Sequence, residues 1–318
     1  MKNKMKCFAC VKVVYFLMSL IFAFNNCFSQ DNKFGIDCEN VNAVNSNLFV
    51  HDDGTPFVLN EFYDSIIYLE GQKFNGTIKI CSEQNIQTLF SYRYGLLHGS
   101  VKTFDTTGVL RECNYYDSSR FTYSEHYYEN GSIERKGAYE KKNKSGVWIY
   151  YYPNLRIRTI EDYSNNISGK WFYFFENGQL LKIEEYLNSK KNGEFVHYYE
   201  NGTISSVEYW KDNLKNGTWK YYFENAQTWK VENYVNGVEE GNWTEYYING
   251  NIKEQIQFKN EVFDGERKEY YENGILKTYQ NWGEGQKNGY CYYYNEKGKV
   301  ICEEQYRNGI LINKKGHF

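Results

Sequence analysis

A glycine recurs every 23 or 24 residues through most of this 318-residue chain, and the sequence that flanks it recurs as well. The clearest copies begin at Gly146, Gly169, Gly193, Gly217, Gly241, Gly265 and Gly289. Weaker copies begin at Gly76, Gly99 and Thr122, which gives about ten units. A fixed short period is the signature of an array of small units, because one unit cannot bury its apolar face alone. The chain is therefore expected to be a repeat array rather than two ordinary globular domains.

Each unit reads as one antiparallel β-hairpin. The phrase Glu-Asn-Gly separates two strand-like runs at 129–131, 176–178, 200–202 and 272–274. Asn-Gly between such runs is a strong hairpin signal, since both residues tolerate positive φ. The turn is either a two-residue type I′ turn or a type I turn with a glycine bulge. A second turn, as in 188–193, closes the unit, and 33 Tyr, 21 Phe and only 2 Pro favour strands.

Aromatic residues occupy fixed positions when each unit is numbered from its lead glycine as position 0. Position +2 is aromatic in the central units, and position +5 is aromatic in nearly all of them. Neighbours such as Tyr198 and Tyr199 point to opposite faces because a strand has a period of two. The prediction is an all-β, elongated array of antiparallel hairpins that forms a twisted, mostly single-layer sheet. A propeller blade needs about 40 residues, so the period excludes that form.

The recurring pattern Gly-x-Trp-x-x-Tyr-Tyr-x-Asn-Gly-x-Ile, followed by a Tyr and a second turn, resembles the bacterial variant of the MORN (membrane occupation and recognition nexus) repeat. The resemblance covers about residues 76–313, within a predicted repeat domain of 76–318. It implies a hairpin array with no catalytic motif and no cofactor. Many bacterial members are labelled antitoxins of toxin–antitoxin systems, and other relatives are protein-binding or membrane-associated scaffolds.

Residues 1–29 have the pattern of a secretory signal peptide. A lysine-rich start precedes an uncharged run from Val13 to Phe24, and Cys27 and Ser29 are small residues before a cut at Gln30. Retention as an uncleaved anchor is the alternative, although the run is shorter than the roughly 20 residues of a membrane span. An exported protein is expected in the periplasm, at the cell surface or outside the cell. Residues 30–75 are interpreted as an atypical N-terminal capping segment.

The charge balance argues against nucleic-acid binding. Four of the 37 basic residues and none of the 40 acidic residues lie in 1–29, which leaves the mature chain at −7. Binding to phosphate backbones needs basic patches, so no nucleic-acid partner is predicted, and membrane association is only weakly supported. No nucleophile, dinucleotide or phosphate-loop motif is present, so the protein is not expected to be an enzyme. No metal site is predicted either: His126 and His197 share position +4 but lie three units apart.

The aromatic rows are interpreted first as the lateral core of a single-layer sheet, in which rings stack from unit to unit. If some of these rings are instead exposed, they are the candidate binding residues. These are Trp148, Trp171, Trp219, Trp243, Tyr198 and Tyr222. Exposed rings can anchor a protein partner or stack on sugars. A glutamate column at position +15 is interpreted as a solvated acidic face. Cys291 and Cys302 lie on the two strands of the last hairpin, where they either form a disulfide or Cys291 fills the slot of a tryptophan.

The leading hypothesis from the sequence is an exported, non-catalytic repeat scaffold that binds another protein. The alternatives are a glycan- or cell-wall-binding module and an immunity protein of the antitoxin type that neutralises a toxin. The positions that carry the same residue type in every repeat are expected to have a structural role. Function is therefore expected where a repeat departs from this pattern, as at Leu155, Ala226, Arg267 and Cys291.

Overall fold

The computed structural model describes residues 49–50, 68–69, 72–73, 75–82, 85–164 and 168–316. Every regular element in these ranges is a β-strand. None of the described segments forms an apolar helix of the length that a membrane span requires. The predicted signal peptide lies outside the described residues, and so does most of the predicted capping segment 30–75.

The chain forms a small sheet and a long one. The small sheet consists of β1 (Phe49–Val50), β2 (Tyr68–Leu69) and β3 (Gln72–Lys73). The long sheet begins with β4 (Gly76–Ser82), β5 (Asn85–Arg93), β6 (Leu96–Phe104), β7 (Leu110–Asp117), β8 (Arg120–Tyr127), β9 (Ile133–Glu140), β10 (Asn143–Tyr151), β11 (Ile157–Asp162), β12 (Gly169–Phe174), β13 (Leu180–Leu187), β14 (Lys190–Lys191) and β15 (Gly193–Tyr198). It continues with β16 (Ile204–Lys211), β17 (Leu214–Lys215), β18 (Gly217–Tyr222), β19 (Thr228–Val235), β20 (Val238–Glu239), β21 (Gly241–Tyr246), β22 (Ile252–Lys259), β23 (Val262–Tyr270), β24 (Leu276–Gly283), β25 (Gln286–Tyr294), β26 (Val300–Arg307) and β27 (Ile310–Gly316).

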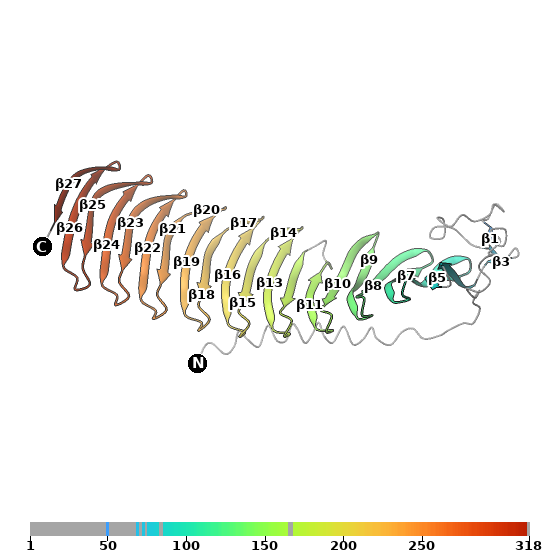
Figure 1. Cartoon of the computed structure of the whole chain (residues 1–318). Helices are drawn as coiled ribbons and strands as arrows, with labels where there is room; N and C mark the ends of the chain where they lie inside the picture. The colour runs from blue at the N-terminus through green and yellow to red at the C-terminus, as the bar shows by residue number, and fades with distance from the viewer. Residues whose placement is uncertain are drawn as a thin grey trace, which may run out of the picture.

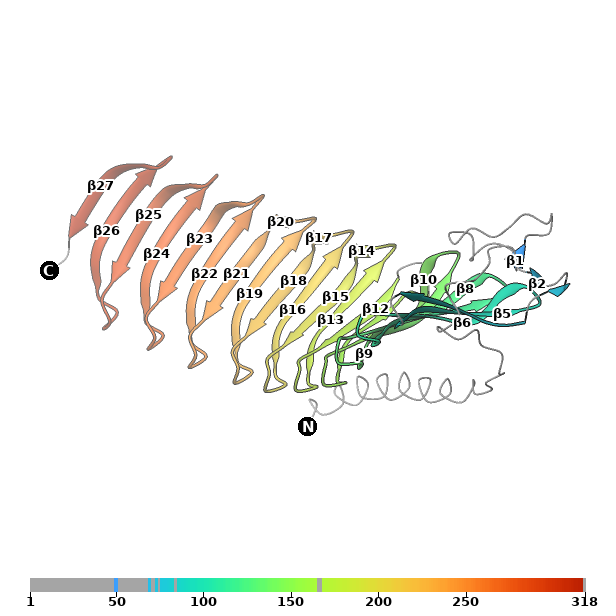
Figure 2. The same ribbon diagram turned by 45° about the vertical axis from the view of Figure 1, so that its right-hand side comes forward.

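The long sheet is open, antiparallel and built in chain order. Its ladders join sequence neighbours, so β4 and β27 lie at its two ends (Figure 1). β14 and β15 are two pieces of one strand, since both pair with β13, and the same holds for β17 with β18 and β20 with β21. The strands rotate steadily along the array, as the turned view shows (Figure 2). The predicted all-β array of hairpins is confirmed.

The Glu-Asn-Gly turn is a type I turn that ends in a left-handed glycine. In the repeat around Gly131, the Tyr128 N–H donates to the Ser132 carbonyl at 2.8 Å, and the Gly131 N–H donates to the Tyr128 carbonyl at 3.0 Å. Only the glycine has positive φ, at 77°, so the type I′ alternative is excluded here. Leu155 and Ala226 occupy the same position with φ of 67° and 66°, although side chains disfavour that conformation.

The turn between repeats is the type I′ turn. Asp212 and Asn213 both have positive φ, at 50° and 68°, and join β16 directly to β17. The lead glycine then lies at a bulge, where the ladder between repeats is interrupted. At Gly193, φ is 115°, and a Cβ atom there would lie 2.6 Å from Oε2 of Glu185. The positive φ at this bulge favours glycine, which accounts for the recurring glycine seen in the sequence.

Tyrosines at position +6 join several repeats to the next, whereas Phe175 and Phe223 stand at this position in two others. The Tyr199 hydroxyl donates to the Tyr222 carbonyl at 2.7 Å, and the Tyr247 hydroxyl donates to the Tyr270 carbonyl at 2.8 Å. The same bond recurs from Tyr128, Tyr152 and Tyr271. Each bond stabilises the array by about 1 kcal/mol net, and the bonds fix the spacing of successive hairpins.

The two faces of the sheet differ. One face, called the ring face below, carries the side chains of positions +2, +4, +13, +15 and +17, because these residues alternate along paired strands. The opposite face holds a compact aliphatic and aromatic cluster of Ile160, Phe172 and Ile183. Tyr198, one of the predicted binding residues, packs against this cluster and is half-buried.

Candidate binding face

A continuous row of aromatic rings runs along the ring face. Its members, in order of contact, are Tyr163, Trp171, Tyr186, Phe195, Trp210, Trp219, Tyr234, Trp243, Phe258, Phe263 and Trp282. Neighbouring centroids are close; those of Trp210 and Trp219, for example, lie 5.0 Å apart. Each ring at position +2 is thus flanked by rings at position +17 of its own and the preceding repeat. The rings meet in tilted and edge-to-face arrangements, which are favourable for aromatic pairs.

The burial of the ring-face tryptophans agrees with the interpretation of the aromatic rows as a lateral core, and it limits which candidate binding residues can contact a ligand. Trp148 is 1% exposed and Trp219 is 3% exposed, so neither presents a ring face to a ligand. Trp171 and Trp243 are half-buried, and Tyr222 is half-buried on the opposite face. The rings are buried although the sheet has one layer, because neighbouring repeats cover them from the sides.

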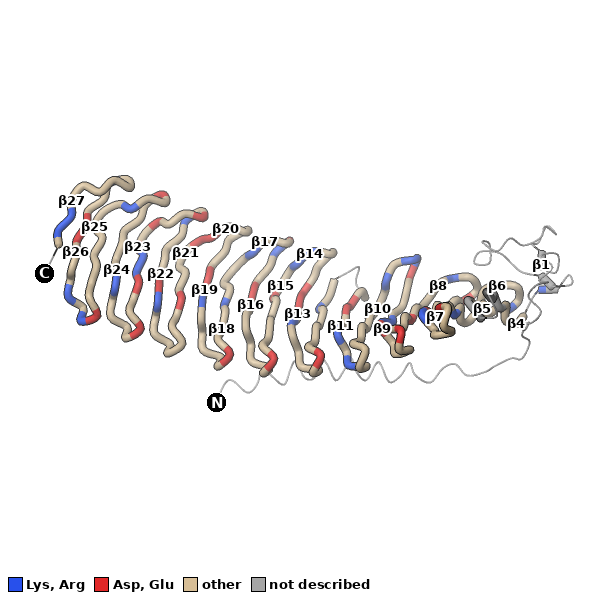
Figure 3. Tube along the Cα trace, in the orientation of Figure 1, with Lys and Arg blue, Asp and Glu red and all other residues tan. Residues whose placement is uncertain are grey.

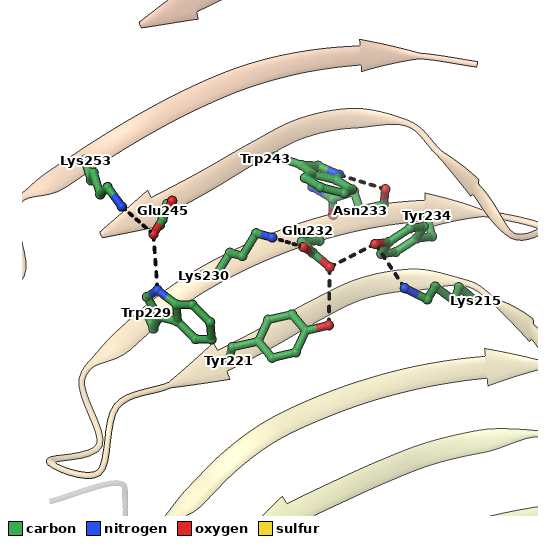
Figure 4. Close-up of polar contacts among 10 residues, drawn as sticks. All are labelled: Lys215, Tyr221, Trp229, Lys230, Glu232, Asn233, Tyr234, Trp243, Glu245 and Lys253. Atoms are coloured by element: carbon green, nitrogen blue, oxygen red, sulfur yellow. Dashed lines mark hydrogen bonds and ion pairs between the residues drawn. The ribbon is translucent and has the colours of Figure 1, made fainter. Parts of the chain in front are cut away.

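The glutamate column at +15 also lies on the ring face. Glu184, Glu232 and Glu304 are only 5–7% exposed, so the interpretation as a solvated acidic face is wrong. Glu232 accepts hydrogen bonds from Tyr234 at 2.9 Å and Tyr221 at 3.3 Å, and it pairs with Lys230 (Figure 4). Glu304 is held by two tyrosines and Lys314 in the same way. These buried charges are matched within the chain, as burial requires.

The pKa of Glu184 does not suit it to the role of a general acid. Burial alone raises the pKa of Glu184, but hydrogen bonds from Lys182 and its two tyrosines outweigh burial and bring the pKa below its ordinary value. Burial and the bond to Glu232 raise the pKa of Tyr234. The Glu184 carboxylate therefore stays ionised and the Tyr234 hydroxyl stays protonated near neutral pH. Glycosidase chemistry needs the reverse, a carboxyl with a raised pKa.

Lysines at position −2 cover the rings of the regular repeats. The Lys191 ammonium lies 4.3 Å from the centre of the Trp210 ring and 5.3 Å from that of Phe195. Lys215 lies 4.4 Å from the Trp219 ring and 4.5 Å from the Tyr234 ring. Lys144 repeats the arrangement over Trp148 and Tyr163, whereas Lys287 lies over Tyr306 of its own repeat and Trp282 of the preceding one. A cation over an aromatic face contributes about 0.5–1 kcal/mol or more when desolvated.

The residues at positions −2, +2 and +15 change in the repeats that begin at Gly241 and Gly265. Position −2 of the first is Glu239, and position +2 of the second is Arg267, whose Nε donates to Glu254 at 2.7 Å. Position +15 holds Ile256 and Gln280 in place of glutamate. The carboxylates have moved to position +4, where Glu245 pairs with Lys253 at 2.9 Å and Glu269 pairs with Lys277 at 2.6 Å.

Trp229 is a further departure that the sequence did not single out. It stands at position +12, is 40% exposed, and its Nε1–H donates to Oε1 of Glu245 at 3.3 Å (Figure 4). Its ring meets Tyr221 edge-on at 6.0 Å. The signal was available, since the other repeats carry no tryptophan at +12.

Of the two interpretations of Cys291 and Cys302, the structure does not contain the disulfide. Register places Cys291 opposite Glu304 and Cys302 opposite Tyr293, and both thiols are free. Cys291 is fully buried at position +2, so the alternative interpretation, a tryptophan slot filled by cysteine, fits its place. In the described residues, no three His, Cys, Asp or Glu side chains gather in a way that would hold a metal ion.

Charged side chains of both signs are spread along the array (Figure 3). Acidic residues recur at one edge, where the Glu-Asn-Gly turns lie. The other edge, formed by the type I′ turns, carries an exposed aliphatic residue beside each of four successive turns. These residues, called the aliphatic edge, are Leu187 (49% exposed), Leu214 (47%), Val235 (52%) and Val262 (41%).

The fold and the ring face define a class, that of all-β hairpin-repeat proteins. Within that class the family model of the MORN repeat variant matches four segments, 167–188, 191–212, 239–260 and 263–282, so this chain carries MORN-variant repeats. The matched segments coincide with hairpins of the long sheet. MORN repeats are protein- or membrane-binding modules, and a non-enzymatic repeat protein is consistent with this family.

Comparison with other proteins adds little beyond the family. No curated protein matches the chain. The solved structures it resembles include a GtfA/B complex bound to UDP and GlcNAc, at 15% identity over 39% of this chain, with a TM-score of 0.19. Another is the Photorhabdus luminescens Tc holotoxin pore, at 9% identity over 72% of this chain, with a TM-score of 0.18. This chain spans 26% of the first chain's length and 16% of the second's.

Proposed function

We propose that this protein is an exported, non-catalytic scaffold whose hairpin array binds another protein along the aliphatic edge. The observation that carries the proposal is the placement of Leu187, Leu214, Val235 and Val262 beside four successive turns. Single exposed apolar residues are ordinary on protein surfaces, but a regular row is typical of an interaction surface. Export rests on the pattern of residues 1–29.

Two side chains of the row lie close to the next turn. A Cβ atom on Gly237 would lie 3.5 Å from Leu214, and one on Gly285 would lie 3.6 Å from Val262. The backbone ladders between successive hairpins hold these side chains at fixed intervals. A rigid row of this kind lowers the entropy lost on binding.

The polar groups of the ring face favour binding over catalysis. Glu184, Glu232 and Glu304 are each held by tyrosine and lysine partners, and their place in the repeat is structural. A catalytic centre would need a group with an uncompensated charge or a raised reactivity at a distinct place. The repeated pairing gives every such glutamate the same role.

A crosslinked pull-down from the cell envelope tests the proposal. Wild-type protein should recover one protein in stoichiometric amount, and the double substitution Leu214→Ser with Val235→Ser should lose it. The matched control is Ile248→Ser, which alters a side chain 52% exposed at the opposite turn edge. Recovery of no protein by the wild type, or equal recovery by the double variant, would contradict the proposal. A toxin as the recovered partner would identify the immunity role.

Glycan binding is a second candidate, favoured by Trp229. Its exposed ring lies beside the Glu245 carboxylate and the Lys253 ammonium, a combination that suits stacking on a sugar and hydrogen bonding to its hydroxyls. Retention of the protein on purified cell wall, lost in Trp229→Ala but kept in Trp219→Phe, would support this candidate. Absence of retention by the wild type would exclude it.

A further inference from the structure

The regular repeats fill one position of the ring face with their own ammonium group. Lys191 and Lys215 stand at position −2, and each lies over the +2 and +17 rings of its own repeat. Where the lysine is present, the residue at +2 is almost wholly buried: Phe195 is 1% exposed and Trp219 is 3% exposed. The lysine stem and head are therefore a lid over the aromatic pair.

The repeat that begins at Gly241 has the rings without the lid. Trp243 at +2 and Phe258 at +17 pack with centroids 4.5 Å apart, as their counterparts do. Position −2 is Glu239, which lies opposite Tyr234 in the ladder, where Lys215 lies opposite Trp210. Trp243 is half-buried, in contrast to Trp219, so part of its ring is open.

Position −2 of this repeat carries a negative charge, on Glu239, where the regular repeats carry a positive one. In the described part of the chain no ion pair neutralises Glu239. Burial, with repulsion from Glu261 and Glu232, raises the pKa of Glu239, and Lys215 and Lys230 oppose this shift only in part. Lys230 does lie 5.1 Å from the Trp243 ring, but its ammonium is paired with Glu232. The local field therefore favours one more cation beside Glu239.

We propose that Glu239, Trp243 and Phe258 form a recognition site for an ammonium group, supplied by a lysine side chain of the protein partner. The inference rests on the proposed protein-binding function. The partner's lysine would take the place that the chain's own lysine takes in the regular repeats, with the carboxylate as its counter-ion and the rings as its cation–π surface. The site adjoins the aliphatic edge, since Val238 pairs with Val235, so one partner surface can engage both.

Indole NMR spectra of the full mature chain, labelled with 15N-tryptophan, test the site without knowledge of the partner. The Nε1–H of Trp243, which donates to the Asn233 carbonyl at 3.3 Å, gives one signal. A blocked Gly-Gly-Lys-Gly-Gly peptide should shift this signal saturably, and the same peptide with acetyl-lysine should not.

The decisive variant is Glu239→Lys, which restores the lysine of the regular repeats. It should keep the fold, bury Trp243 and weaken peptide binding by at least about tenfold, since its own ammonium fills the site. Glu224→Lys makes the same charge change at an exposed turn of the opposite edge and should bind like the wild type. An unchanged affinity in Glu239→Lys, or no saturable shift in the wild type, would overturn the proposal.

The pull-down separates this inference from the proposed function. If wild-type protein recovers a partner and Glu239→Lys recovers it equally, the ammonium site is wrong and the scaffold function stands. If the wild type recovers no partner, the scaffold function fails, and the peptide titration still decides whether the ammonium site exists.

Discussion

Replacement of Trp219 by alanine should cause a larger local loss of stability than replacement of Trp243. The side chain is 3% exposed, its Nε1–H donates to the Tyr209 carbonyl at 2.9 Å, and the Lys215 ammonium lies 4.4 Å from the ring centre. Truncation of a buried aromatic residue to alanine costs about 3–5 kcal/mol. The lost hydrogen bond and the lost cation–π contact, each worth about 1 kcal/mol, place the expected value near 5 kcal/mol.

Hydrogen exchange measured by mass spectrometry suits a repeat array, because unfolding of such chains is not a single two-state event. Peptides from β18, β19 and β21 should lose protection in Trp219→Ala, and peptides from β6 and β7 should not. Trp243→Ala is the matched control, since that ring is half-buried and its indole hydrogen bond is longer, at 3.3 Å. An effect of Trp219→Ala below about 1.5 kcal/mol, or no larger than that of Trp243→Ala, would refute the argument that neighbouring repeats bury this ring.

Three further predictions follow from the turns, the inter-repeat bonds and the buried carboxylates. Ala226→Gly should raise the midpoint of urea unfolding, with a gain of about 1 kcal/mol, because Ala226 holds φ at 66°; Gly202→Ala, at φ 83°, should lower it. Tyr199→Phe should cost about 1 kcal/mol and increase exchange at the junction with the next repeat, a result that normal exchange there would disprove. The lowered pKa of Glu184 means that its contribution to stability is complete above its ordinary pKa of 4.5 and is lost as the pH falls through the lower folded value. Urea midpoints measured from pH 7 to pH 3 should therefore fall for the wild type and depend less on pH in Glu184→Gln.

Much of the fold could be predicted because its determinants are local. The spacing of lead glycines reflects a bulge whose positive φ favours glycine, as at Gly193, and the phrase Glu-Asn-Gly specifies its own turn. Alternating aromatic residues then assign the two faces of each strand. The type of turn was left open because the sequence alone does not show which residue has positive φ. In the structure, Gly131 and the glycines at the same position of other repeats have positive φ.

The site residues were harder to predict because exposure in a repeat array is decided between units. Trp148 and Trp219 were named as candidate binding residues in case the rings are exposed, and both are buried. Of the four column breaks expected to carry function, Leu155 and Ala226 are residues in a strained turn and Cys291 fills a ring slot, whereas Arg267 belongs to a changed set of ion pairs. The break that carries the ammonium proposal, Glu239, is visible in the sequence only once the lysine lid is known.

The sequence by itself determined the repeat, the hairpins, the order of the strands and the matched family, since each depends on contacts within about 24 residues. The tertiary structure decided which side chains are covered. A lysine from one repeat lies over rings of two strands, as Lys215 does with Trp219 and Tyr234, and a glutamate becomes buried only when tyrosines close around it. Burial in a single-layer sheet comes from neighbours at the sides, so it depends on the side-chain packing of adjacent strands, which the repeat pattern does not specify.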